Sequence, residues 1–167
     1  MAEEETERVR RVLTTTAQVQ AAVIEVADRA ERSLALFSHG LEPALYDQLD
    51  FIDAVTRLVL AHRYARVRIL LIDPTYLVQE THRLVELGRR LVSFVEFRRV
   101  HRDHRQREDG FLIADDHSLL HLAQATHHYG AVSLNDRHMA SKFLREFDEI
   151  WGRSGSSPEK EARRLNV

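Results

Sequence analysis

Short apolar runs recur along the middle of the chain and predict the strands of a sheet. Residues 67–72 form the strongest run, because nearly every position is apolar and several are β-branched, as in a central strand covered on both faces. Similar runs predict strands at residues 33–38, 92–100, 111–114, 119–122 and 129–134. Because a polar turn separates 111–114 from 119–122, these two strands are expected to form a hairpin.

Apolar positions with helical spacing predict helices before, between and after the strands, at residues 16–30, 50–62, 75–90 and 135–151. In the last of these, Phe143, Phe147 and Trp151 fall on the side that would face the sheet. The alternation of strands and helices predicts an α/β fold, with a mixed, largely parallel sheet and helices on both faces.

The length of 167 residues suits one domain with a real core. Its first segment, MAEEETERVRR, is charged and predicts an acidic leader over residues 1–11. The α/β domain is expected to cover residues 12–152. Residues 153–167 are rich in Gly and Ser and then charged, so they predict a flexible tail.

The absence of cysteine excludes disulfides, thiolate metal sites and cysteine nucleophiles, and it fits a reducing compartment. The N-terminus has no apolar signal core, and no run of about twenty apolar residues occurs anywhere in the chain. We therefore expect a cytoplasmic protein without a membrane span.

Positive charge is concentrated between residues 98 and 107, although the formal net charge of the chain is only −2. This basic run contains five arginines and two histidines: Arg98, Arg99, Arg102, Arg105, Arg107, His101 and His104. Asp103, Glu108 and Asp109 lie within or beside it. The run therefore has two interpretations, an anion site or a solvated, salt-bridged edge of the domain.

The segments after the basic run follow a distinctive order. An apolar strand closing on an aspartate is followed by a second short strand, by YGAVSL at 129–134, and by a helix that ends in LREFDEIW at 144–151. Together with VRILLIDP at 67–74 and the segment at 82–91, this order resembles one half-domain of the phospholipase D superfamily, of an uncharacterised bacterial type, over most of residues 12–152. The resemblance implies a homodimer, because superfamily members with one half-domain commonly pair two copies across a shared cleft.

In that superfamily the chemistry belongs to the pattern His-x-Lys-x-x-x-x-Asp. The resemblance implies that the His attacks the phosphodiester, the Lys holds the phosphoryl oxygens and the Asp fixes the site. No frame of this pattern exists here, because aligning Asp115 with the Asp puts Glu108 at the His position and Gly110 at the Lys position. Aligning Asp116 instead puts Asp109 and Phe111 there. Since a carboxylate in place of the nucleophile would repel a phosphate, we predict a degenerate active site.

The predicted ligand-binding site joins the basic run to the aspartates after the next strand: Arg102, Arg105, Arg107, His101, His104, Asp115 and Asp116. In the proteins that the domain resembles, the same loop and strand border the phosphate cleft. No catalytic residue is predicted, but an enzyme would have to use His101, His104 and Asp115. We predict no metal and no cofactor, because an extended strand would separate the backbones of His117 and His121 by roughly 13 Å.

Three functions fit these observations. The first is a non-catalytic phospholipase-D-like domain that binds an anionic or phosphate-bearing partner or acts as a regulatory interaction module. The alternatives are a phosphodiesterase or nuclease with a rearranged His/Asp/Arg site, and a dimeric nucleic-acid-binding module. A net charge of −2 counts against a large surface that tracks phosphates, so nucleic acid is not the favoured partner.

Overall fold

The computed structural model describes residues 7–75 and 82–155. Its strands are β1 (Val9–Leu13), β2 (Ser33–Ser38), β3 (Arg66–Leu71), β4 (Val95–Arg99), β5 (Gly110–Ala114), β6 (Ser118–Leu122) and β7 (Gly130–Leu134). The helices are α1 (Thr16–Asp28), α2 (Pro43–Tyr46), α3 (Leu49–Ala61), α5 (Arg83–Arg90) and α6 (Arg137–Arg153), with a short 3₁₀ turn, η1 (Arg102–His104). The predicted helix at 75–90 lies partly outside the described residues.

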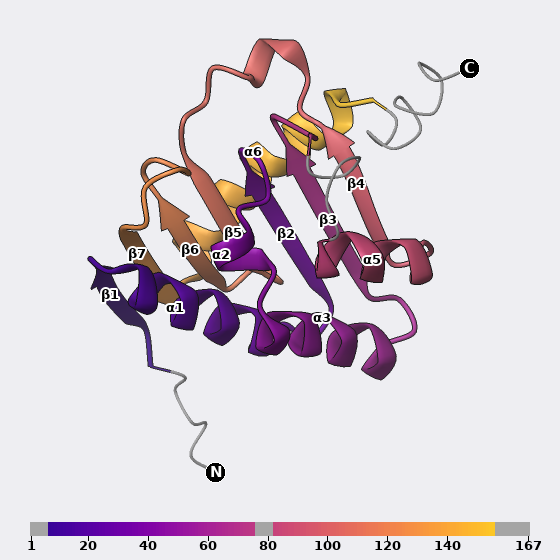
Figure 1. The fold of residues 1–167 in the computed structure, drawn as a ribbon. Coiled ribbons are helices and arrows are strands. Elements are labelled where there is room, and N and C mark those ends of the chain that lie inside the picture. The colour runs from indigo at the N-terminus through magenta and orange to yellow at the C-terminus, as the bar shows by residue number, and fades with distance from the viewer. Residues whose placement is uncertain (1–6, 76–81, 156–167) are drawn as a thin grey trace.

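All seven strands belong to one sheet in the order β1-β7-β6-β5-β2-β3-β4 (Figure 1). The predicted α/β class and the mixed sheet are confirmed, but the expected balance of pairings is wrong. Only β2–β3 and β3–β4 are parallel, and the other four pairings are antiparallel. The reason is that β5, β6 and β7 follow one another through short connections without a crossover helix, and such connections join antiparallel strands.

Helices cover both faces of the sheet, as predicted. Alternate side chains of β2 show the division, because Leu34 and Leu36 join the core under α1, α3 and α5, whereas Ala35 and Phe37 join the core under α6. In Figure 1, α1 and α3 cross in front of the sheet and α6 lies behind it. The central strands β2 and β5 are thus buried on both sides, which leaves the ends of the sheet as the places where polar side chains gather.

Strand β1 spans the predicted boundary between leader and domain, since it runs from Val9 to Leu13 and pairs with β7. Only Leu13 of this edge strand is buried, so the segment lacks the alternating pattern that identifies a half-buried strand. At the other end of the chain, Arg153 still belongs to α6, and Ser154 is buried. The rest of the predicted tail, from residue 156 onward, lies outside the described residues.

Candidate functional site

The seven residues of the predicted site lie at opposite ends of the sheet. The basic run precedes β5, while Asp115 and Asp116 follow it, and a strand of five residues spans about 13 Å. In Figure 1 the loop between β4 and β5 rises at the top of the sheet, and the β5–β6 turn lies at the other end. Within one chain the structure therefore does not bring the basic run and the two aspartates into one cleft, nor His101 and His104 next to Asp115. Ligand binding by these residues stays a prediction.

Asp115 has a structural role at the start of β2. Its carboxylate accepts hydrogen bonds from the backbone N–H groups of Glu31, Arg32 and Ser33 at 2.8–2.9 Å. Its own N–H donates to the Ser33 carbonyl at 2.9 Å. With a φ of 52°, Asp115 adopts the left-handed conformation that Asp tolerates in turns. The carboxylate thus joins the β5–β6 turn to β2.

The other charged groups of the β5–β6 turn are also paired within the chain. Asp116 accepts two hydrogen bonds from Arg137 at 2.9 and 3.0 Å. The His117 ring contacts two groups. Its Nε2 lies 3.3 Å from the Asp115 carboxylate, and its Nδ1 lies 2.9 Å from the Ser118 hydroxyl. Because Ser118 is fully buried and its hydroxyl also accepts from the Asn135 N–H, it has no exposed face for a reactant.

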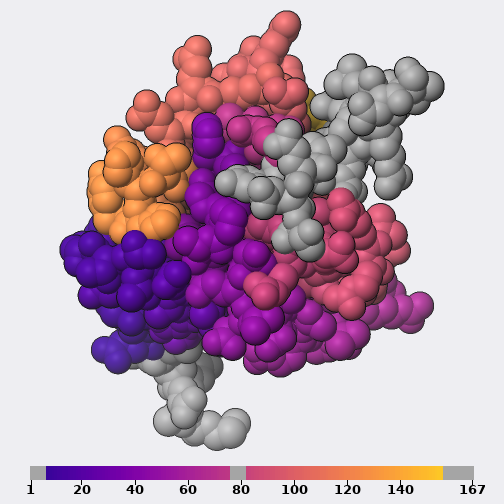
Figure 2. All heavy atoms as spheres, in the orientation of Figure 1, coloured from indigo at the N-terminus to yellow at the C-terminus, as the bar shows by residue number. Residues whose placement is uncertain are grey.

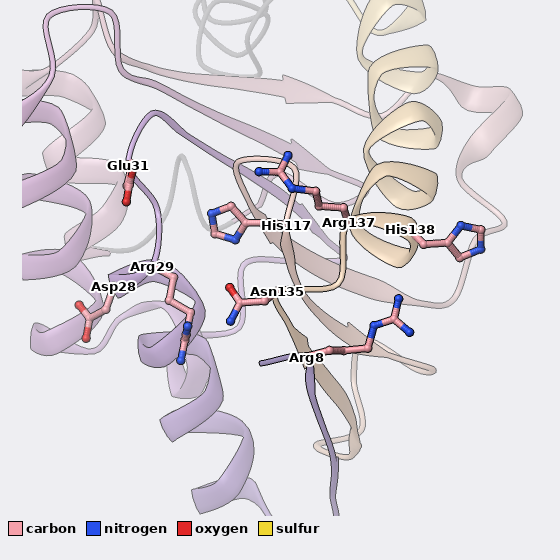
Figure 3. Close-up of a pocket in the computed structure, with 8 residues that line it drawn as sticks. All are labelled: Arg8, Asp28, Arg29, Glu31, His117, Asn135, Arg137 and His138. Carbon is pink, nitrogen blue, oxygen red and sulfur yellow. The ribbon is translucent and has the colours of Figure 1, made fainter. Parts of the chain in front are cut away.

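His117 and Arg137 border a hollow of about 680 Å³, which we call the hairpin cavity. It is lined by Arg8, Asp28, Arg29, Glu31, His117, Asn135, Arg137 and His138 (Figure 3). The acidic and basic groups offset one another: Asp28 pairs with Arg57, and Arg8 with Asp136. The charges in and around the hairpin cavity are therefore largely satisfied by the fold.

The first part of the basic run packs against the end of α6. The backbone N–H of His101 donates to the Ser154 hydroxyl, and its Nδ1 accepts from the Asp103 N–H. Arg153 contacts Asp103 at 2.9 Å and the His104 Nε2 at 3.2 Å. For this part of the run, the interpretation as a salt-bridged edge describes the contacts better than an anion site.

The second part of the run lines a different hollow, of about 400 Å³, where β2 ends and β5 begins. We call it the carboxyl-end cavity, and its lining is His39, Arg105, Gln106, Arg107, Glu108, Gln124, Ala125, Thr126 and His127. The carboxyl ends of the strands in open α/β sheets are the usual place for ligands. Of the seven predicted residues, only Arg105 and Arg107 reach this cavity.

These two arginines differ in what remains free to bind. Arg105 is exposed and donates its Nε to the Val100 carbonyl at 2.8 Å, which leaves its terminal nitrogens without a partner in the part of the chain that the structure describes. Arg107 donates to both carboxylate oxygens of Asp109 and to Glu146 of α6. It also lies over the rings of Phe37 and Phe111. The terminal nitrogens of Arg105 thus remain available at the cavity, whereas Arg107 anchors the loop.

Asp109 is the centre of this anchor. It accepts hydrogen bonds from Arg107 and lies 3.1 Å from the His121 Nε2. Burial alone would raise the pKa of the Asp109 carboxyl, but the hydrogen bonds and positive charge of His121 and Arg107 outweigh it and lower the pKa to about 2. The network ties the β4–β5 loop to β6 and α6, and so holds the rim of the carboxyl-end cavity in place.

The residues at the His and Lys positions of the superfamily pattern are Glu108, in the lining of the carboxyl-end cavity, and Gly110, which packs against Ala125 of that lining. Glu108 lines it, and its carbonyl accepts from the Ala125 N–H at 2.8 Å. A Cβ added to Gly110 would lie 3.2 Å from the Ala125 Cβ and 3.3 Å from the Phe37 carbonyl oxygen. Both contacts are tight and one is to backbone, so the fold leaves little room for a longer side chain at residue 110.

Sequence reasoning missed the polar residues that other segments bring to the carboxyl-end cavity, namely His39, Gln124 and His127. His39 directly follows β2. Its position at the start of a loop after a parallel strand was the signal that could have identified it as a residue of the site. Beyond β3, the side-chain hydrogen bond from Thr75 lowers the pKa of Asp73, and positive charge on His39 and Arg99 adds to the effect. His39, Asp73 and Arg99 thus form a polar group at the ends of β2, β3 and β4.

No three His, Asp or Glu side chains among residues 7–75 and 82–155 are grouped so as to hold a metal ion. In the same residues, no helix has the length and apolar character to cross a membrane. The lining of the carboxyl-end cavity offers arginine, histidine, amide and hydroxyl groups and the carboxylate of Glu108.

Solved structures resemble this fold over nearly its whole length. Nuc from Salmonella typhimurium, a phospholipase D family member, matches with a TM-score of 0.60 at 16% identity, covering 89% of this chain and 97% of that one. NucT from Helicobacter pylori matches with a TM-score of 0.59 at 10% identity, covering 90% and 98%. TrmBL2, an archaeal chromatin protein whose structure shows a novel mode of DNA binding, matches with a TM-score of 0.61 at 18% identity, over 92% of this chain.

The fold is accordingly that of a phospholipase-D-like domain. This chain aligns with only 56% of the TrmBL2 chain.

Residues 15–165 match the model of the family described as Domain of unknown function (DUF7931), and the chain belongs to that family. A search of curated proteins finds no significant match to the sequence.

Proposed function

We propose that this protein is a non-catalytic phospholipase-D-like domain that binds a phosphate-bearing anion in the carboxyl-end cavity. The observation that carries the proposal is the packing at Gly110, where the Cβ of a lysine would lie in tight contact with Ala125 and the Phe37 carbonyl, so that these neighbours would have to give way. The cavity keeps donors for an anion but lacks the nucleophile and the lysine of the superfamily pattern. Binding can thus persist without phosphoryl transfer.

The donors come from three segments of the chain. The terminal nitrogens of Arg105 match phosphate oxygens in a bidentate arrangement, and Gln124 offers an amide N–H₂ group. His39 and His127 add positive charge when they are protonated. Glu108 opposes an anion, so the affinity is expected to be modest and to fall as salt screens the exposed charges.

The test is a thermal-shift series with pyrophosphate, comparing the wild type with Arg105→Glu, Arg105→Lys and Arg102→Glu. A ligand that binds only the folded state raises Tm by mass action, so we expect a gain in the wild type that rises with pyrophosphate concentration and falls with added salt. Arg102 is the matched control, because it is exposed and lies in the same loop but does not line the cavity. Arg102→Glu should keep the gain, Arg105→Lys most of it, and Arg105→Glu little of it. Equal gains in all four proteins would overturn the proposal.

A parallel assay separates binding from the phosphodiesterase alternative. We expect the protein not to hydrolyse bis-p-nitrophenyl phosphate. Among the described residues that line the cavity there are two histidines, His39 and His127, but no lysine to pair with either of them. Turnover that disappears in His39→Ala or His127→Ala would instead identify a rearranged catalytic site at the same cavity. Short oligonucleotides in the thermal-shift series test whether nucleic acid supplies the phosphate.

The proposal includes a pair of chains, since the half-domain resemblance implies two copies around a shared cleft. Light scattering over a concentration series should then give twice the 19.4 kDa mass of one chain. A constant monomer mass would reject the pairing and leave single-chain binding at the carboxyl-end cavity intact.

A further inference from the structure

Two segments without a single acidic residue meet at the amino ends of β3 and β4. The first, residues 60–66, joins the last residues of α3 to β3 and reads LAHRYAR. The second, residues 89–94, joins the end of α5 to β4 and reads RRLVSF. Acidic residues make up 26 of the 167 positions in the chain, and these 13 residues contain none, although Asp28 and Glu31 line a hollow beside Ala61 and His62 at one border of the first segment.

The fold brings the two segments side by side. The Val67 N–H donates to the Phe94 carbonyl at 2.8 Å, immediately before the parallel register that pairs Val67 with Val95. The helices that lead into the two segments, α3 and α5, are also in contact. Figure 2 shows the end of α3 and the segment after α5 as neighbours at the lower right of the molecule. We call the surface formed by residues 60–66 and 89–94 the basic-apolar patch.

Three large apolar side chains of the basic-apolar patch are strongly exposed: Leu60 by 76%, Tyr64 by 78% and Val92 by 75%. They are half of the six large hydrophobic residues that are exposed in the described part of the chain. Val92 falls in a predicted strand, but β4 begins only at Val95, so its side chain meets solvent instead of the sheet. Exposed apolar side chains grouped on neighbouring segments are typical of a surface that binds a partner.

The same two segments carry four arginines. Arg63, Arg66, Arg89 and Arg90 are all exposed, and the Arg63 guanidinium lies 5.6 Å from the centre of the Tyr64 ring. Arg89 pairs with Glu86 at 3.3 Å, whereas the remaining three lie in segments with no carboxylate. A second copy of this chain would bring the same positive charge against the patch, so self-association here is disfavoured.

We propose that the basic-apolar patch docks on an anionic lipid surface. Arginines would contact the phosphate groups of the lipids, the Tyr64 ring would lie at the headgroup level, and Leu60 and Val92 would enter the acyl boundary. Nucleic acid would satisfy the arginines and Tyr64 but would leave Leu60 and Val92 in water. A lipid surface covers all of these groups at once.

The test is co-sedimentation of the full chain with vesicles of phosphatidylglycerol and phosphatidylcholine, against vesicles of phosphatidylcholine alone. We expect binding to the anionic vesicles only, weakening as salt is added. Arg63→Glu with Arg66→Glu should lower the partition coefficient at least tenfold. Leu60→Ser with Val92→Ser, which leaves the charge unchanged, should lower it severalfold.

Lys142→Glu with Arg145→Glu is the matched control, since both residues are exposed on α6 on the other side of the sheet and the change in charge is the same. The control variant should bind nearly as well as the wild type. The proposal is overturned if the wild type ignores anionic vesicles, or if the control loses as much binding as the Arg63/Arg66 variant. It is also overturned if the Leu60/Val92 variant binds vesicles normally while the arginine variant loses oligonucleotide binding, because the patch would then recognise nucleic acid. Circular dichroism of each variant verifies that it is folded.

Discussion

The two ends of β5 carry similar kinds of charged side chains, but the fold uses them differently. At the hairpin cavity, Asp115 is bonded to three backbone amides, and Asp116 is bonded to Arg137. At the carboxyl-end cavity, Arg107 is held in the same way by Asp109 and Glu146, but Arg105 keeps its terminal nitrogens exposed. The comparison teaches that charge density alone does not mark a binding site. A binding site is marked instead by hydrogen-bonding groups that have no partner among the described residues of the fold.

The largest effect is expected at Asp115. Asp115→Ala removes the acceptor of three backbone amides and places Ala at a φ of 52°, so it should lower the free energy of unfolding by about 3 kcal/mol. Asp116→Ala is the control, because its ion pair with Arg137 is exposed on both sides and is worth less than about 1 kcal/mol. Urea unfolding measures both variants. Equal losses would remove the structural role assigned to Asp115.

The next effect concerns the pH dependence of stability through Asp109. Its folded pKa of about 2 lies below the ordinary value of 3.8, so between these values the unfolded chain binds more protons than the folded one. The carboxylate therefore stabilises the fold above pH 3.8, and this contribution, about 2 kcal/mol, is lost as the pH falls through about 2. Urea unfolding between pH 5 and pH 2 should show a shallower loss for Asp109→Asn than for the wild type. Parallel curves would mean that the network with Arg107 and His121 does not hold the loop.

The smallest effect is expected at Glu108, the residue at the nucleophile position of the superfamily pattern. Glu108→Gln removes a negative charge from the lining of the carboxyl-end cavity, so pyrophosphate affinity should rise severalfold, on the order of 1 kcal/mol. Glu31→Gln at the hairpin cavity makes the same change at the other end of the sheet and should leave the affinity unchanged. Calorimetric titration compares the two. A larger gain for Glu31→Gln would assign the anion to the hairpin cavity.

Much of the fold could be predicted because its interior follows simple periodic patterns. The apolar runs identified β2 and β3, and helical spacing identified α1, α3 and α6. Strand β1 was missed because it is an edge strand with Arg10, Arg11 and Val12 exposed, which gives no apolar alternation. The parallel character of the sheet was overestimated because strand pairing depends on where a chain returns after a loop, and the apolar pattern of a strand does not specify its neighbour.

The site was harder to predict than the fold. Arg102, Arg105 and Arg107 look equivalent in sequence, yet only Arg105 and Arg107 line the carboxyl-end cavity. The distinction depends on η1, which turns the first part of the basic run toward the end of α6. His39 reaches the cavity from a segment more than sixty residues away, and the antiparallel pairing of β2 with β5 places the end of β2 beside the start of β5.

The most direct test of the central claim is an amide ¹H–¹⁵N correlation titration of the chain with pyrophosphate. The account predicts that shifts concentrate at His39, Arg105 and residues 124–127, and that the amides of Asp115, Asp116 and His117 stay unchanged. The phosphorus spectrum of the same sample should show intact pyrophosphate throughout. Shifts concentrated at the β5–β6 turn and Arg137 would contradict the account, because the anion would then bind at the end of the sheet whose charges the fold already satisfies.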